Sequence, residues 1–341
     1  MENDMSRIIV ETMVRKALKD LQDSPERSTR NLVDMALQFS EGRFQRSFFS
    51  TAHTMLENEQ SSYYRLIKDI AAHVDNEKIL RFGMNIGYNS CTAGARQIRK
   101  EEETCGYNIP WTIGIELDSQ RMIDNPASYH SVITQGEKLG IYTWMLFAHG
   151  RMPECMALMD AHPDDAFILF CEPEDVSLAM IDSASMVAQL MLAVQYTEGC
   201  GSVFDGLRDR KLLYSAYRYY TDEDVAEIVN GDFFSSVKQV HPVFSALIAK
   251  PGCSEPAKEK VVAYVESVRK EQIFETVAWE LGYDNSRIDS IISDEPALTF
   301  FNSAGWLYAL SDTENENYGN LFNNDLYQIL EQAFPKKRRA F

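Results

Sequence analysis

Long apolar runs are missing from this sequence. The longest mostly apolar stretches, such as residues 186–194, are interrupted well short of the roughly 20 residues that span a bilayer. The first residues, Met1 to Asp4, are polar and acidic and lead into a helical pattern, so no secretory signal is predicted. We therefore expect a cytosolic protein with no membrane partner.

Positive charge is also scarce. The chain has 33 Lys and Arg against 51 Asp and Glu, which gives a formal net charge of −18. A phosphate backbone or an anionic lipid surface carries the same sign, so binding it would bring like charges together. We therefore expect no nucleic-acid partner. One basic cluster, Lys336 to Arg339, is expected to be a solvated tail.

Cysteine motifs are absent as well. The six cysteines are scattered without a C-x2-C pair, so neither a disulfide framework nor a zinc-finger arrangement is suggested. There is also no G-x-S-x-G nucleophile elbow and no H-E-x-x-H zinc helix, which leaves hydrolase functions with little support. Most of the cysteines are expected to be reduced, buried and small apolar residues.

The composition that remains is that of a folded protein. Its 341 residues are 45% hydrophobic and 25% charged, so a substantial core is expected. Residues 1–76 show helical patterns only, and Ser24-Pro25 supplies an N-cap followed by proline at the first helical position. Beyond a first helix that includes Ile8 to Leu21, helices are expected near 27–40, 44–57 and 61–73.

From Ile79 the sequence alternates between short apolar stretches and amphipathic ones. The spacing between the starts of successive apolar stretches is enough for one strand, one crossover helix and two short loops. This spacing predicts parallel strands that curl into a sheet or barrel. Asn125-Pro126 and Gly140 bound one such helix, and Thr221 with Asp224 resembles a capping box. The expected strands are 79–86, 110–117, 140–147, 166–171, 189–195 and 212–218.

After Val240 the pattern changes again. We expect a long helix near 255–280, a hairpin around 297–309 that turns at Ser303-Ala304-Gly305, and a helix near 323–333. The predicted fold is thus α/β, a partial (β/α)6 TIM-like barrel with an N-terminal helical region and a C-terminal hairpin-plus-helix appendage. The expected boundaries are 1–76 for the helical region, 77–250 for the barrel and 251–341 for the appendage.

Ligand sites of parallel α/β folds form at the carboxyl ends of the strands. The side chains there could serve as acid/base groups or coordinate a hard cation, or they could be solvated residues and helix caps. The tyrosines at 214, 217, 219 and 220 could stack on a ligand or simply pack. The ligand-binding candidates are Asn85, Gly87, Tyr88 and Asn89 after the first expected strand, Glu116 and Asp118 after the second, His149 after the third and Glu172 after the fourth.

Residues 83–94 have three glycines and two asparagines where the first expected strand meets a helix. Backbone amides there could hold an anion. The spacing matches neither the dinucleotide fingerprint nor a P-loop, so glycines that permit a tight turn and close helix packing are the favoured interpretation.

In order along the chain, these pieces resemble radical S-adenosylmethionine enzymes with a SPASM-type C-terminal extension, a family that modifies peptides and matures other enzymes. Gly114-Ile115-Glu116 stands where that family has G-G-E, and Ala148-His149-Gly150 where it has T-N-G. Residues 305–310, 318–322 and 326–330 resemble the SPASM hairpin, its G-N segment and its closing helix. The resemblance covers about residues 79–334 and implies a barrel with a C-terminal extension that binds S-adenosylmethionine and a peptide.

The sequence departs from the family at the cluster. The family holds a four-iron cluster with three cysteines at C-x3-C-x2-C after the first strand. Here that stretch has Cys91 alone, Cys105 lies fourteen residues on, and Ala309-Leu310 stands where the hairpin would carry a cysteine. One thiolate cannot hold the cluster, so radical chemistry is expected to be lost unless Cys91, Cys105 and Cys171 converge.

Two functions follow from this departure. The first is a cluster-less protein with no cofactor that binds a peptide, protein or small molecule in the barrel mouth, in an accessory or regulatory role. The second is an enzyme, either a radical S-adenosylmethionine enzyme with an atypical iron–sulfur site or a metal-dependent one that uses the mouth carboxylates. A third, blander interpretation is an unrelated α/β barrel, since fold alone does not fix function.

Overall fold

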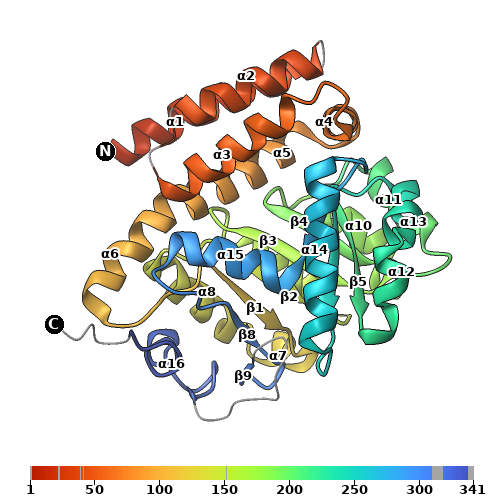
Figure 1. Cartoon of the computed structure of the whole chain (residues 1–341). Helices are drawn as coiled ribbons and strands as arrows, with labels where there is room; N and C mark the ends of the chain where they lie inside the picture. Colours follow the sequence, from red (N-terminus) through yellow and green to blue (C-terminus); the bar gives the residue numbers. More distant parts are fainter. Residues whose placement is uncertain are drawn as a thin grey trace.

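The computed structural model describes residues 2–21, 24–38, 40, 42–150, 152–308 and 318–336. A curled half-barrel sheet runs through the middle of the molecule, with helices around it and the N-terminal helices stacked at one end (Figure 1). In these ranges no helix is both long and apolar enough to cross a membrane. The expected fold class is confirmed.

The N-terminal region is helical, as the sequence predicts. Pro25 is the first residue of its helix, and Ser61 caps another by accepting a hydrogen bond from Tyr63 N. The helices are α1 (Glu2–Leu21), α2 (Pro25–Gln38), α3 (Arg43–Leu56) and α4 (Ser62–His73).

The strand expected at 79–86 is wrong, because these residues are helical. Asp75 caps helix α5 (Asn76–Met84), which continues through a π-helix, η1 (Asn85–Gly94), into α6 (Ala95–Cys105). The buried residues of α5 recur at helical spacing, as Leu80 and Met84 show. A short apolar run does not by itself separate strand from helix, and here the Asp75 cap favours the helix.

The described sheet has nine strands in the order β7-β6-β5-β4-β3-β2-β1-β8-β9, parallel except for the antiparallel β8–β9 pair. The strands expected near 110, 140, 166, 189 and 212 are confirmed as β1 to β5. The bounds are β1 (Thr112–Glu116), β2 (Thr143–Phe147), β3 (Ala166–Cys171), β4 (Leu190–Gln195), β5 (Tyr214–Tyr220), β6 (Phe244–Ala249), β7 (Val277–Glu280), β8 (Thr299–Phe301) and β9 (Leu307–Tyr308).

The connecting helices cover the convex face of the sheet. Pro126 precedes α8, and Gly140 ends it in a left-handed conformation, while Thr221 and Asp224 form the expected capping box. The helices and 3-10 turns are α7 (Ser119–Asp124), α8 (Ala127–Leu139), α9 (Met152–Asp160), η2 (Pro173–Asp175), α10 (Leu178–Ala184), α11 (Gly201–Asp209), η3 (Asp222–Asp224), α12 (Val225–Val229), α13 (Asp232–Val237), η4 (Lys238–Val240), α14 (Glu255–Glu271), α15 (Leu281–Ile292) and α16 (Leu326–Ala333).

The concave face is closed over part of its area by α15, which crosses in front of the sheet in Figure 1. The Asn285 side chain of α15 contacts the Met145 sulfur of β2, and the Asn285 backbone carbonyl accepts a hydrogen bond from the Trp111 indole. Alternation along β2 directs Trp144 and Leu146 to the convex core and Met145 to the concave one. The carboxyl end of the concave face remains outside this cover.

The C-terminal segment differs in part from the expectation. The helix expected over 255–280 ends at Glu271, where Gln272 has a left-handed backbone, and strand β7 follows. Strand β6 and helix α15 are absent from the expected pattern. The hairpin is confirmed, with its turn at residues 303–305 and Gly305 at φ +87°, and so is the closing helix α16.

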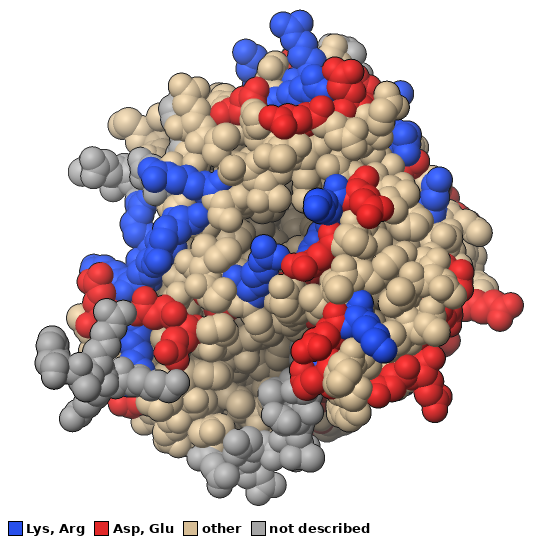
Figure 2. All heavy atoms as spheres, viewed as in Figure 1, with Lys and Arg blue, Asp and Glu red and all other residues tan. Residues whose placement is uncertain are grey.

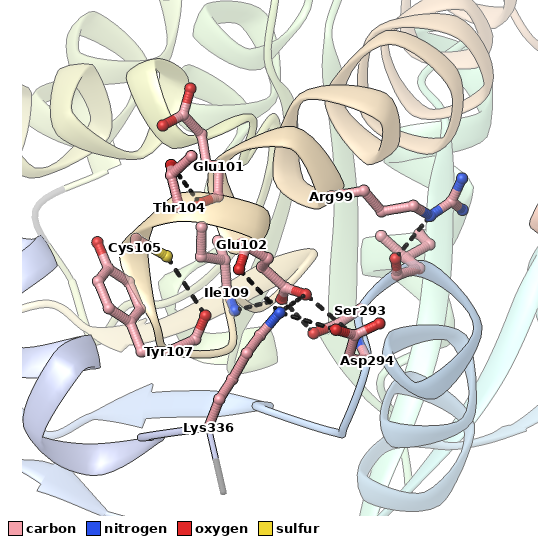
Figure 3. Close-up of polar contacts among 11 residues, drawn as sticks. Arg99, Glu101, Glu102, Thr104, Cys105, Tyr107, Ile109, Ser293, Asp294 and Lys336 are labelled. Atoms are coloured by element: carbon pink, nitrogen blue, oxygen red, sulfur yellow. Dashed lines mark hydrogen bonds and ion pairs between the residues drawn. The ribbon is translucent and has the colours of Figure 1, made fainter. Parts of the chain in front are cut away.

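Glu102 joins three distant segments at the edge of the fold (Figure 3). This buried carboxylate accepts hydrogen bonds from Ile109 N at 2.8 Å and from the Ser293 hydroxyl, and it lies 3.2 Å from Lys336 Nζ. The expectation of a solvated tail is therefore wrong for Lys336, which also pairs with Asp294 at 2.8 Å. The remaining residues of that cluster, 337–339, lie outside the described residues.

Candidate functional site

The candidate residues lie at two opposite edges of the sheet. Glu116, His149 and Glu172 lie at or follow the carboxyl ends of β1, β2 and β3, as expected. Asn85 and Asn89 instead hydrogen bond to the chain just before β3, at its amino end. The expected grouping of all eight candidates around one mouth is therefore wrong, because it depended on a strand at 79–86.

Glu116 and Tyr308 form the centre of the carboxyl edge. The Tyr308 hydroxyl donates a hydrogen bond of 2.9 Å to Glu116 Oε1. Burial, and then the Glu116 charge, raise the pKa of Tyr308, so the hydroxyl remains protonated as a donor. Burial also raises the pKa of Tyr219 to about 12, with smaller contributions from Glu116 and Glu172. Strands β5 and β9, which are not neighbours in the sheet, thus each bring a tyrosine near Glu116.

An aromatic floor lies beneath these polar groups. Phe147 and Phe170 stack with ring centroids 4.5 Å apart, and Tyr217 meets Phe170 edge-on at 5.3 Å. Phe300 packs over β1 where Gly114 has no side chain, since a Cβ at Gly114 would lie 2.2 Å from the Phe300 ring. The glycine of the Gly114-Ile115-Glu116 motif therefore serves packing of the floor.

A second polar group lies at the rim. His149 Nδ1 is 3.6 Å from Glu172 Oε1, and one ligand atom each of His149, Glu172 and Asp175 lie within 4.8 Å of one another. Asp118 has a different role, because its carboxylate caps α7 by accepting a hydrogen bond from Arg121 N at 2.6 Å. The arrangement offers carboxylates and one imidazole at a largely exposed edge.

The glycine-rich segment at 83–94 packs against a helix. A Cβ at Gly94 would lie 2.3 Å from the carbonyl oxygen of Gly140, and one at Gly140 would lie 2.7 Å from that of Gly94. These glycines thus let η1 approach the end of α8, which agrees with the favoured interpretation. Gly87 is exposed and Tyr88 is half-buried on the same segment. A ligand-binding role for these residues stays a prediction.

All six cysteines are free, and all but Cys105 are buried. Burial raises the pKa of Cys91 to about 12 and also raises that of Cys171, which disfavours the thiolate that iron requires. The Cys105 thiol donates a hydrogen bond of 3.4 Å to the backbone oxygen of Tyr107. The hairpin positions 309 and 310 lie outside the described residues.

Two residues of the mouth are absent from the sequence candidates, Tyr308 and Asp175. Tyr308 belongs to the hairpin, which the sequence pattern assigns to an appendage, but β8 pairs with β1 and brings the hairpin to the mouth. Asp175 lies in the turn η2, one turn beyond Glu172. Because Asp175 lies close to the end of a predicted strand, the sequence alone could have suggested it as a candidate.

Charge is unevenly distributed on the face seen in Figure 1. Figure 2 shows Lys and Arg side chains gathered on the left, while Asp and Glu side chains are spread over the top, the lower left and the right. Described cavities of about 300 and 240 Å³ lie beside Lys78 and beside Gln135, away from the residues of the mouth.

Comparisons with known proteins give likenesses in structure alone. No family model and no curated protein matches the sequence. Streptococcus suis SuiB has a TM-score of 0.49 at 6% identity, over 70% of each chain, and has also been solved bound to the precursor peptide SuiA. Native anSMEcpe with bound AdoMet has a TM-score of 0.43 at 8% identity, over 64% of this chain and 80% of that one.

Escherichia coli coproporphyrinogen III oxidase (HemN), described as a radical SAM enzyme, is similar over 53% of this chain and 56% of its own, with a TM-score of 0.33 at 8% identity. All three TM-scores lie below 0.5 and all three identities below 10%, so these likenesses leave the reaction of this chain open.

Proposed function

We propose that this chain binds a positively charged peptide segment at the carboxyl edge of its half-barrel and acts as an accessory or regulatory protein. The observation that carries the proposal is the pair of carboxylates, Glu116 and Glu172, held with Tyr219 and Tyr308 above an aromatic floor.

The chemistry of the edge favours a cation. Carboxylate oxygens pair with ammonium and guanidinium groups, and tyrosine faces attract the same groups through cation–π contacts. Glu172 is 47% exposed and Glu116 is half-buried, so both are reachable by a side chain from solvent. Glu116 and Glu172 lie at the ends of β1 and β3, which are two strands apart in a sheet whose strands are spaced about 4.8 Å, so a few residues of an extended peptide at about 3.3 Å each suffice to reach from one to the other.

The spacing and burial of the cysteines support a function without radical chemistry. The C-x3-C-x2-C motif that holds a four-iron cluster is absent from the sequence, and the buried thiol of Cys171, at the end of β3, is directed to the Ala193 carbonyl oxygen at 3.7 Å. We therefore assign no reductive cleavage of S-adenosylmethionine to this chain.

Fluorescence anisotropy with labelled peptides tests the binding proposal. A Lys- and Arg-rich peptide is expected to bind, and its Glu-substituted counterpart is not. Glu116→Gln and Glu172→Gln should each weaken binding about three- to tenfold, because each removes a partly exposed ion pair of about 1 kcal/mol. Glu174→Gln, an exposed neighbour, is the matched control and should change little. Equal binding of acidic and basic peptides would contradict the proposal.

Anaerobic purification with iron and sulfide assays tests the absence of a cluster. A colourless, iron-free protein that gives weak or no heat with S-adenosylmethionine in calorimetry is the expected result. Stoichiometric iron and sulfide would restore the alternative, a radical S-adenosylmethionine enzyme with an atypical site.

A metal-dependent enzyme is the second candidate, favoured by the cluster of His149, Glu172 and Asp175. Imidazole with carboxylates suits Mn²⁺ or a similar divalent ion. Titration with Mn²⁺ separates the candidates, since stoichiometric binding that His149→Gln removes would favour the enzyme.

A further inference from the structure

A cluster of ionisable side chains lies at the amino edge of the sheet, opposite the mouth. His130 and Glu137 lie two turns apart on α8, and His162 and Asp165 belong to the connection between α9 and β3. His162 Nδ1 is 2.8 Å from Glu137 Oε1 and 3.9 Å from Asp165 Oδ2. One ligand atom each of Glu137, His162 and Asp165 lie within 4.8 Å of one another.

Asp165 is the unusual member of this cluster. Its side chain is fully buried, with 0% exposure, and neither carboxylate oxygen has a hydrogen-bond partner among the described residues. A buried carboxylate without hydrogen bonds or a counter-charge is strongly unfavourable, so it must be neutralised.

The donor set suits a divalent metal ion. One imidazole nitrogen and two carboxylates are common zinc ligands, and two carboxylate charges balance the charge of Zn²⁺. Two ligand atoms about 2.0–2.2 Å from a tetrahedral zinc ion lie about 3.3–3.6 Å apart. The separations of 2.8 and 3.9 Å lie on either side of this value, so small side-chain rotations would meet it.

His130 orients the imidazole of His162. His130 Nδ1 is 3.1 Å from His162 Nε2, and the two rings stack with centroids 5.3 Å apart. A proton on His162 Nε2 donated to His130 leaves Nδ1 free to face Glu137 and Asp165. Metal-binding histidines commonly donate their second ring N–H in this way.

The backbone that carries the ligands is held by η1. Asn85 Nδ2 donates to the carbonyl oxygens of Pro163 and Asp165, at 3.0 and 2.6 Å, and Asn89 Nδ2 donates to that of Asp164 at 2.8 Å. These asparagines thus fix the turn between His162 and Asp165. The site is preformed in the fold, which lowers the ordering cost of binding.

We propose that Glu137, His162 and Asp165 bind a Zn²⁺ ion at the amino edge of the sheet, with His130 as a positioning residue. The ion ties α8 to the start of β3. Glu137 is 30% exposed, so the fourth coordination position on its side is open to water. The site is independent of the peptide-binding mouth, because it lies at the other end of β3.

Calorimetry of the full chain with Zn²⁺ after chelator treatment tests the proposal, together with metal analysis and thermal unfolding. The wild type should bind one zinc ion per chain and unfold at a higher temperature with zinc. His162→Gln and Asp165→Asn should weaken binding by at least about 100-fold, and His130→Ala by about 10- to 100-fold. Asp165→Asn relieves an unpaired carboxyl, so it should fold without zinc and keeps the test independent of stability.

Two histidine variants elsewhere complete the design. His53→Gln removes a surface histidine that lies between Asp34 and Glu57, and it should leave zinc binding unchanged. Wild-type protein without a stoichiometric zinc site would overturn the proposal in favour of a protonated Asp165. The proposal would also be overturned if zinc binding survives in Asp165→Asn but disappears in His149→Gln, since the zinc would then lie at the mouth.

Discussion

Replacing Glu102 with Ala should strongly destabilise the fold. The side chain is 2% exposed and contacts residues from three segments, at 109, 293–294 and 336. Loss of the carboxylate leaves the buried Ile109 N–H without its acceptor, at a cost of about 1–3 kcal/mol. Removing one partner of a buried ion pair costs about 3–5 kcal/mol.

The two costs overlap, so they are not summed. Lys336 is 23% exposed and keeps its contact with Asp294, which places the charge contribution at the low end. We expect Glu102→Ala to lower the free energy of unfolding by about 3 kcal/mol. Glu102→Gln keeps one acceptor oxygen for Ile109 N–H and should cost less than the alanine variant.

Equilibrium unfolding in urea, followed by tryptophan fluorescence and circular dichroism, measures the effect. The slope of free energy against urea should be unchanged if the native fold is retained. Glu103→Ala, the exposed next residue of α6, is the matched control and should stay within about 0.5 kcal/mol of the wild type. A loss below about 1 kcal/mol for Glu102→Ala would refute the view that this carboxylate joins the three segments.

Two further predictions concern the core. Gly114→Ala should destabilise the fold by about 1–3 kcal/mol, because the new Cβ would lie 2.2 Å from the buried Phe300 ring. Gly83→Ala is the control and should be neutral or stabilising, because nothing lies within 4 Å of its new Cβ. Thermal unfolding that ranks the two variants the other way would refute the packing argument. Burial raises the pKa of Asp289 to about 7 in the folded chain, above its ordinary value, so the fold favours the protonated carboxyl. The stability that this protonated carboxyl contributes is complete below about pH 4 and is lost as the pH rises through 7. Asp289→Asn removes this loss, and its stability relative to the wild type should increase by about 1.4 kcal/mol per pH unit between pH 4 and 7 in urea unfolding. Parallel curves would show that the carboxyl does not titrate in this range.

Local sequence patterns determine the N-terminal helices and strands β1 to β5. Apolar spacing, Pro25 and the turn at residues 303–305 act through neighbours in the chain, so they are legible in the sequence. The candidates Glu116, His149 and Glu172 follow from the same reasoning, because parallel strands place their carboxyl ends at one edge.

Tertiary structure decides what the short apolar runs become. Residues 79–86 and 277–280 are both brief, but the first lies behind the Asp75 cap as helix, and the second pairs with β6 as a strand. The choice depends on which neighbours bury each run, and those neighbours are distant in the chain. Local periodicity contains no information about them.

The same limit separates the two polar edges. The sequence placed Asn85 with Glu116, whereas the fold places Asn85 beneath the turn at 163–165 and brings Tyr308 to Glu116 from 192 positions away. Composition and local pattern determine that this is an acidic α/β half-barrel without a cluster motif. Which side chains meet at its edges is decided by the packing of strands and helices that are far apart in sequence, because hydrogen bonds and buried charges are satisfied only in three dimensions.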